Sequence, residues 1–136
     1  MTVHLESAVP GRETILLIDD EEIIIDVSHE ILESLGYRVW TARTGQEAID
    51  LYKSRKNEID LVILDMIMPG MSGGDTFDRL KTINTEVKVI LSTGYSLTGQ
   101  AREIMARGCR GFIQKPYKIE TLSQKVREVL EAPESA

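Results

Sequence analysis

The sequence predicts an α/β fold, a doubly wound three-layer sandwich of the (βα)5 type built on a parallel five-stranded sheet. Short apolar runs alternate with helical patterns five times along the 136 residues, and this alternation is typical of parallel strands joined by crossover helices. The first, third and fourth runs are nearly all aliphatic, as expected of strands covered on both faces. A chain of this length forms one domain, and right-handed crossovers place its helices on both sides of the sheet.

Five apolar runs are expected to form the strands. In chain order they are Ile15–Ile18, Arg38–Thr41, Leu61–Leu64, Val87–Leu91 and Gly111–Ile113. Polar residues follow several of these runs and should therefore lie at the carboxyl ends of the strands. Open α/β sheets bind their ligands beyond these ends, at the point where the strand order reverses.

Five helical segments separate and follow the runs, near residues 21–35, 45–55, 74–83, 97–107 and 119–131. Gly36 and Gly108 follow the first and fourth segments and are expected to adopt the left-handed conformation that ends a helix. Thr44, with Glu47 three residues later, is typical of a capping box that opens the second segment. The last segment carries an apolar stripe at helical spacing, formed by Ile119, Leu122, Val126, Val129 and Leu130.

The folded domain is expected to span residues 13–131. Residues 1–12 mix Pro, Gly, Ser and charged residues, and we predict that they form a disordered lead-in. Residues 132–136 are predicted to be a frayed tail.

The composition argues against several classes of function. A net charge of −6 argues against a nucleic-acid partner and against direct contact with an anionic membrane. No apolar stretch approaches the roughly 18 residues of a membrane span, and the first residues contain no hydrophobic signal core. The single cysteine, Cys109, excludes an intramolecular disulfide and is expected to be a buried apolar side chain. A cytoplasmic location is therefore expected, because free thiols fit a reducing compartment.

Three acidic residues end two of the predicted strands. Asp19 and Asp20 follow the first strand, and Asp65 follows the third, although Asp is depleted in strands and costly to bury unpaired. If these strands are neighbours, the three carboxylates meet at one edge, where each pair at about 4 Å repels by roughly 4 kcal/mol. Such a cluster requires a cation, and hard oxygen ligands suit Mg²⁺.

A hydroxyl and an ammonium group are expected at the same edge. Thr93, followed by Gly94, ends the fourth strand, and Lys115, followed by Pro116, ends the fifth. Three acids, a hydroxyl and a lysine together form a constellation suited to phosphoryl transfer. The acids would hold Mg²⁺ while the hydroxyl, the lysine and nearby amides hold phosphate oxygens.

Four motifs occur in the expected order at the strand ends: IDD, DMIMPGMSG, STG and KPY. Together they resemble the receiver domain of two-component response regulators, over about residues 13–131. The stretch STGYSLTGQAREIMARGCRGFIQKPYKIETLSQKVREVLE looks most like receivers of hybrid sensor histidine kinases. The resemblance implies a flavodoxin-like sandwich with strand order 2-1-3-4-5.

The resemblance also implies a role for each site residue. Asp65 would be the phosphoacceptor. Mg²⁺, or Mn²⁺ in its place, would be bound directly by Asp20, Asp65 and the Ile67 carbonyl, with Asp19 acting mainly through bound water. Lys115 would pair with Asp65 before transfer and with phosphoryl oxygens afterwards. The phosphoryl group would also meet the Thr93 hydroxyl and the Met66 and Gly94 amides.

A conformational switch is implied as well. Thr93 would move towards the phosphoryl group, and Phe112, at the family's rotating aromatic position, would fill the vacated space. This change would alter the face formed by the fourth helix, fifth strand and fifth helix. The Lys115–Pro116 peptide bond is expected to be cis on resemblance alone, since cis is the minority state for X–Pro bonds.

The expected partner is a histidine kinase or a histidine phosphotransfer domain, and the chain would be a monomer or a weak dimer through that switch face. It would catalyse only its own phosphorylation and dephosphorylation, as a single-domain regulator or as a receiver segment of a hybrid kinase. We expect Ile24, Val27, Ile31 and Leu35 to face the sheet from the first helix. Ile23 or Ile25 would then remain partly exposed beside the acids, as a docking surface for kinase helices.

Other interpretations remain open at this point. Asp19 or Asp20 could cap the first helix, because Asp is a favoured N-cap residue. Phe112 fits an ordinary packed aromatic as well as a switch. A phosphohydrolase of the haloacid dehalogenase type also uses an Asp nucleophile and Mg²⁺, but it resembles D-x-D, whereas Ile67 lies two residues after Asp65 here. A degenerate scaffold that takes no phosphate is disfavoured because the family positions are intact.

Overall fold

The computed structural model describes residues 11–94 and 99–133 and confirms the predicted fold. Five parallel strands form one sheet in the order β2-β1-β3-β4-β5. The strands are β1 (Thr14–Ile18), β2 (Arg38–Ala42), β3 (Leu61–Asp65), β4 (Val89–Thr93) and β5 (Gly111–Gln114). The helices are α1 (Glu22–Ser34), α2 (Gly45–Arg55), α3 (Gly73–Ile83), α4 (Gly99–Ala106) and α5 (Ile119–Glu131).

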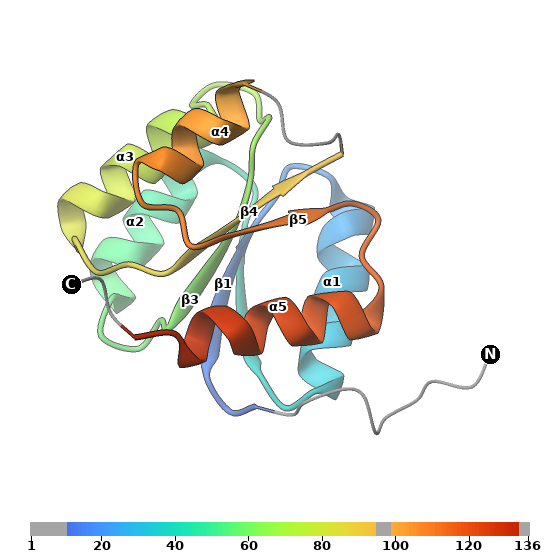
Figure 1. Ribbon diagram of the computed structural model, residues 1–136. Helices are drawn as coiled ribbons and strands as arrows, with labels where there is room; N and C mark the ends of the chain where they lie inside the picture. The colour runs from blue at the N-terminus through green and yellow to red at the C-terminus, as the bar shows by residue number, and fades with distance from the viewer. Residues whose placement is uncertain (1–10, 95–98, 134–136) are drawn as a thin grey trace.

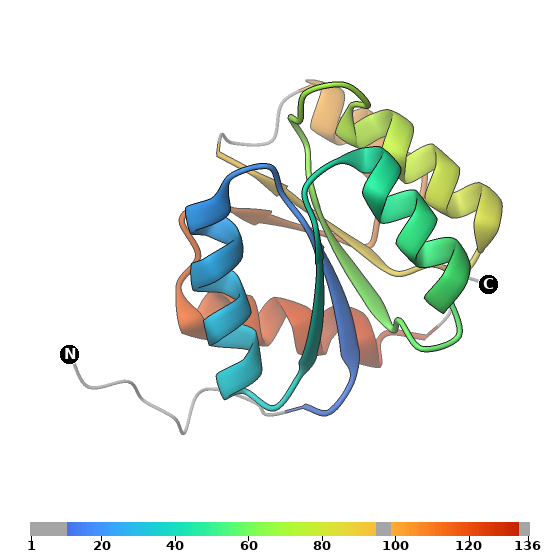
Figure 2. The same cartoon turned by 180° about the vertical axis from the view of Figure 1, so that it is seen from behind.

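The helices form two layers around the sheet. α2, α3 and α4 cover one face and α1 and α5 cover the other, as Figure 1 shows and the reverse view in Figure 2 confirms. Each layer has its own apolar cluster, because β1, β3 and β4 are buried along their whole length and contribute side chains to both faces. This double burial explains why the runs of these strands are nearly continuous aliphatic sequences.

The observed helix ends agree with their sequence signals. Gly36 and Gly108 have positive φ angles, +98° and +110°, in the left-handed region that glycine adopts without penalty. The Thr44 hydroxyl accepts a hydrogen bond from the Glu47 backbone N–H at 3.1 Å, so the predicted N-cap of α2 is confirmed. Ser72 caps α3 in the same way through the Asp75 N–H, a cap that we did not predict.

The boundary of β4 differs most from the prediction. The apolar run starts at Val87, but the strand spans Val89–Thr93. The Val87 N–H donates to the Asn84 carbonyl oxygen in a turn, although its side chain is buried. The strand instead continues through Ser92 and Thr93, which pair with Ile113 and Gln114 of β5. Hydropathy thus located the buried segment, whereas pairing with the neighbouring strand decides where the strand ends.

The predicted buried face of α1 is confirmed at Leu35 but is otherwise displaced by about a quarter of a turn from the observed face. The buried residues are Ile25, Ser28, Leu32 and Leu35. Val27, which we expected to face the sheet, is 48% exposed, and Ile23 is 69% exposed. The error arises because three consecutive isoleucines fit more than one helical phase, and the true stripe contains a serine. The expectation that Ile23 or Ile25 remains exposed is confirmed for Ile23.

Cys109 lies in the turn before β5 and is buried, as expected, at 6% exposure. Its thiol is 3.2 Å from the Val89 carbonyl oxygen and 3.4 Å from that of Gly111. Within residues 11–94 and 99–133, no helix has the length and apolar character needed to cross a membrane.

Candidate metal and phosphoryl-transfer site

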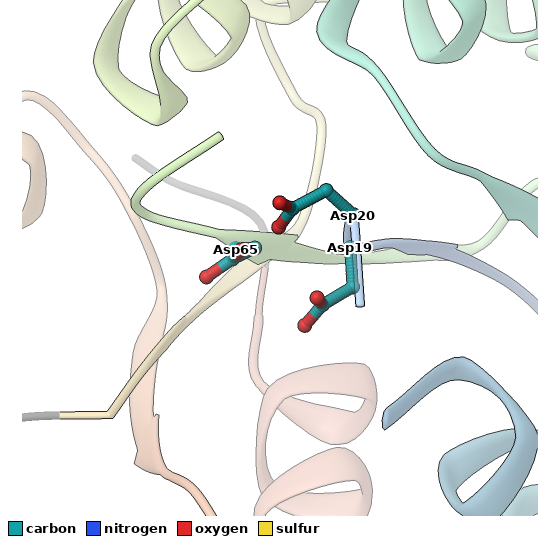
Figure 3. A group of neighbouring side chains, drawn as sticks. All are labelled: Asp19, Asp20 and Asp65. Atoms are coloured by element: carbon teal, nitrogen blue, oxygen red, sulfur yellow. The ribbon is translucent and has the colours of Figure 1, made fainter. Parts of the chain in front are cut away.

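The strand order brings the three acids together. β1 and β3 are neighbours, with Ile18 opposite Leu64, so the residues that follow these positions emerge at the same edge. One carboxylate oxygen from each of Asp19, Asp20 and Asp65 lies within 4.8 Å of the others. Figure 3 shows the carboxylates of Asp19 and Asp20, from the end of β1, beside that of Asp65, from the end of β3. Asp19 and Asp65 are buried and Asp20 is exposed.

Lys115 contacts two of these acids. Its ammonium Nζ is 3.1 Å from Asp65 Oδ1 and 2.6 Å from Asp19 Oδ2, and its side chain is only 10% exposed. Burial lowers the pKa of Lys115, but the contacts with Asp19 and Asp65 outweigh burial and raise it to about 12. The lysine is therefore charged at neutral pH. We predicted its contact with Asp65 but not the shorter contact with Asp19.

The cluster carries more negative charge than one lysine can balance. Burial raises the pKa of the Asp65 carboxyl, the Asp19 carboxylate raises it further, and Lys115 opposes both effects; the result is a pKa of about 7. A carboxyl with a pKa near neutrality holds a proton for part of the time, since two unscreened carboxylates repel each other. A divalent cation would displace that proton and satisfy the remaining oxygens.

Asp19 has a second partner at the start of α1. Its Oδ1 accepts a hydrogen bond from the Glu21 backbone N–H at 2.9 Å. The N-cap residue of α1 is Glu21, and its side chain makes no capping bond. Neither Asp19 nor Asp20 is therefore the N-cap, and the alternative that one of them serves mainly to cap this helix is wrong.

A cavity of about 450 Å³ lies beside the acids. It is lined by Asp20, Glu21, Asp65, Ile67, Thr93, Gly94 and Lys115. Thr93 is 2% exposed at the end of β4, and its carbonyl oxygen accepts the Lys115 N–H at 2.8 Å. The structure thus brings most of the predicted side chains to one cavity. Glu21, whose carboxylate is 3.8 Å from Lys115 Nζ, was missed, although it directly follows the two aspartates.

Three other predicted residues lie as follows. The Met66 N–H, expected to help hold phosphate, donates to the Ser92 carbonyl oxygen at 2.9 Å, so a contact with phosphate would require this bond to be shared or broken. Phe112 is partly buried on β5, opposite Leu91. The peptide bond between Lys115 and Pro116 is cis, as the resemblance implied.

One hydrogen-bonded pair close to the site in sequence was also missed. The hydroxyl groups of Ser92 and Tyr117 are in direct contact. Tyr117 belongs to the KPY motif, but a serine inside an apolar strand gives no indication of its partner in the sequence.

Comparisons with known proteins agree with this geometry. The family of response regulator receiver domains matches residues 15–127. Sensor kinase CckA of Brucella abortus is 33% identical over 129 residues, 95% of this chain but 14% of that protein. Sporulation initiation phosphotransferase F of Bacillus subtilis is 32% identical over 119 residues, 88% of this chain and 94% of that protein.

Solved structures give the same result. A response regulator receiver domain protein from Clostridium thermocellum superimposes with a TM-score of 0.82 and 33% identity, covering 87% of this chain and 94% of that chain. The Borrelia burgdorferi complex described as CheX-CheY-BeF3-Mg superimposes with a TM-score of 0.83 and 26% identity, covering 96% of both chains.

Proposed function

Because this chain belongs to the response regulator receiver domain family of two-component systems, we propose that it accepts a phosphoryl group on Asp65. The donor would be a phosphohistidine on a histidine kinase or a histidine phosphotransfer domain. The single observation that carries this proposal is the position of Asp65, whose carboxylate lies 3.1 Å from Lys115 Nζ within a three-acid cluster beside an open cavity.

In the proposed transfer, the P–N bond of the donor breaks and a P–O bond forms to an Asp65 carboxylate oxygen. The histidine nitrogen keeps the electron pair and takes up a proton from solvent. Lys115 lies close enough to follow the charge from the carboxylate to the phosphoryl oxygens, and Thr93 and Gly94 line the same cavity. Positioning and charge compensation are the main contributions that phosphoryl transfer requires from a protein.

The donor set fits a hard divalent cation such as Mg²⁺ or Mn²⁺. Asp20 and Asp65, with the Ile67 carbonyl, would bind the ion directly. Asp19 would act through water, because its two oxygens already meet Lys115 and the Glu21 N–H. The ion would neutralise the carboxylates and polarise the phosphoryl oxygens. The raised pKa of Asp65 supports this assignment, since burial and the Asp19 carboxylate together outweigh Lys115, and a bound cation would favour the charged carboxylate.

Phosphorylation would act as a signal through a change of packing. The phosphoryl group adds roughly −2 charge, which would draw the Thr93 hydroxyl inward and allow Phe112 to fill the space behind it. The affected face is formed by α4, β5 and α5, where a target or a second copy of the chain would bind. The chain would thus be a signalling phosphoacceptor in the cytoplasm, where the free Cys109 thiol fits a reducing environment.

The two relatives suggest two kinds of protein in which such a chain occurs. The match to CckA falls within a much longer sensor kinase, whereas phosphotransferase F is matched over almost its whole length. A receiver segment of a hybrid sensor histidine kinase and a single-domain regulator both follow from the same site. The haloacid dehalogenase alternative is set aside, because the chain belongs to the receiver family.

Phosphorylation by acetyl phosphate tests the proposal directly. We expect intact-mass analysis to show the addition of one phosphoryl group to the native chain in Mg²⁺, and none to Asp65→Asn. Asp60→Asn is the matched control, because Asp60 lies just before the same strand at its opposite end, where its carboxylate accepts the Thr14 N–H; it should be phosphorylated normally. Phosphorylation of Asp65→Asn, or equal phosphorylation of the native chain in EDTA, would contradict the proposal.

A further inference from the structure

Ser92 connects two segments that form the proposed phosphoryl-transfer site. It lies on β4 opposite Asp65 and is 1% exposed. Its carbonyl oxygen accepts the N–H of Met66, the residue after Asp65, at 2.9 Å. Its side-chain hydroxyl contacts the Tyr117 hydroxyl, two residues after Lys115. One buried strand residue therefore touches both the segment that follows Asp65 and the segment that carries Lys115.

Tyr117 attaches the loop between β5 and α5 to the core. Its ring packs against the apolar cluster that lies between the sheet and the α1 and α5 layer, while Pro116 and Lys118 on either side are exposed. Burial raises the pKa of the Tyr117 hydroxyl to about 12, so the group remains a neutral hydrogen-bonding hydroxyl at physiological pH. A buried serine hydroxyl without this partner would be unfavourable, because buried polar groups require hydrogen bonds.

We propose that Tyr117 is a positioning residue for Lys115: the hydrogen bond between Tyr117 and Ser92 holds Lys115 in place. This inference rests on the proposed phosphoacceptor function. The bond ties the loop to the strand that lies beside Asp65, so that the Lys115 ammonium is presented to Asp65 and then to the phosphoryl oxygens.

The charges around Lys115 show why such an anchor matters. The ammonium is 2.6 Å from Asp19, 3.1 Å from Asp65 and 3.8 Å from Glu21. These acids compete for one flexible side chain, and two of them are not the phosphoacceptor. If the loop moved away from Ser92, the ammonium could stay with Asp19 or Glu21 and lose Asp65. The Tyr117 bond should therefore affect the rate of transfer more than the binding of the donor.

The test compares Tyr117→Phe, Ser92→Ala and the double variant, with acetyl phosphate as donor and saturating Mg²⁺. We expect each single variant to lower the maximal rate of Asp65 phosphorylation about twofold to tenfold, the range for loss of one hydrogen bond. The half-saturating acetyl phosphate concentration should not change. The double variant should be no slower than the slower single variant, because both substitutions remove the same bond.

Tyr52→Phe is the matched control. It also removes a buried tyrosine hydroxyl, one that accepts a hydrogen bond from Asn84 away from the acid cluster, and it should leave the rate unchanged. Denaturant unfolding of every variant shows whether each remains folded under the assay conditions. A similar loss of rate in Tyr52→Phe, or losses that multiply in the double variant, would overturn the positioning role.

A second readout does not depend on phosphorylation. The NMR signals of the Lys115 side chain report its contacts with the carboxylates, and we expect them to shift in Tyr117→Phe and Ser92→Ala but not in Tyr52→Phe. If the native chain accepts no phosphoryl group, the proposed function fails, and these signals alone decide the positioning role. Unchanged Lys115 signals in Tyr117→Phe would overturn it in either case.

Discussion

Burial favours the protonated form of the Asp65 carboxyl, and the Asp19 carboxylate favours it further, whereas the Lys115 ammonium favours the charged form. The two effects that favour the proton are larger, and the pKa rises from 3.8 to about 7. Between these two values the native chain binds more protons than the unfolded chain does. Stability contributed by this group therefore falls as the pH rises from about 4 to 7, because the native state must give up a proton that the unfolded state has already lost.

Asp65→Asn should consequently stabilise the metal-free protein, and more so at pH 8 than at pH 5. Asparagine resembles the protonated carboxyl that the native state prefers at low pH, so the substitution removes a charge only at high pH. Thermal unfolding in EDTA at the two pH values measures the difference, with Asp60→Asn as the control. An equal gain at both pH values, or a lower melting temperature at pH 8, would refute the electrostatic explanation.

Single residues also show what the sequence could and could not reveal about the site. The convergence of Asp19, Asp20, Asp65 and Lys115 follows from the strand ends, which the apolar runs predict, and from the strand order, which the resemblance to receiver domains implied. Lys115 contacts both Asp19 and Asp65, and the two distances differ by only tenths of an ångström. The Ser92–Tyr117 contact depends on how a loop packs under the sheet. Neither of these features can be predicted from the spacing of residues in the sequence.

Among the elements, α1 presents two exposed apolar side chains on an acidic surface. Ile23 and Val27 are 69% and 48% exposed, one helical turn apart, and Ile67, which lines the cavity, is 59% exposed. Among the residues that the structure describes, these three are the exposed large hydrophobic side chains. Ile67 lines the cavity with the acids, and Ile23 lies in the first turn of α1, shortly after Asp19 and Asp20. This placement supports a docking role for the start of α1, although the helical phase predicted for Val27 was wrong.

Ile23→Lys should slow phosphoryl transfer from a cognate kinase by about fivefold or more, as expected for a docking residue at an interface. The rate with acetyl phosphate should be unchanged, because this donor does not need a docking surface. Ser54→Lys, which adds the same charge at an exposed position near the end of α2, is the control. An equal loss with both donors would mean that the substitution disturbs the site itself rather than the docking of the kinase.

For the whole molecule, the alternation of strands and helices was sufficient to predict the architecture. The parallel sheet and its strand order then bring residues as distant in sequence as Asp19 and Lys115 to within 2.6 Å. Element boundaries were less predictable, because ends such as that of β4 are decided by pairing with a neighbouring strand. The same long-range assembly implies that a ligand at the sheet edge stabilises the entire fold.

Mg²⁺ should therefore raise the melting temperature of the native chain, and less at pH 6 than at pH 8, since the proton on Asp65 competes with the ion. A ligand present at 100 times its dissociation constant contributes about 2.7 kcal/mol. Asp20→Asn and Asp65→Asn should reduce the response. NaCl at matched ionic strength controls for screening of the acids, and an equal shift with NaCl would argue against a specific metal site.

Cys109 supplies a means of following the molecule without an added label. The thiolate is the reactive form of cysteine, and here burial raises the pKa of the only thiol in the sequence to about 11. An alkylating reagent should therefore modify the protein only when the turn between α4 and β5 opens. The rate of alkylation then measures how often the edge of the sheet opens locally, next to the surface expected to respond to phosphorylation.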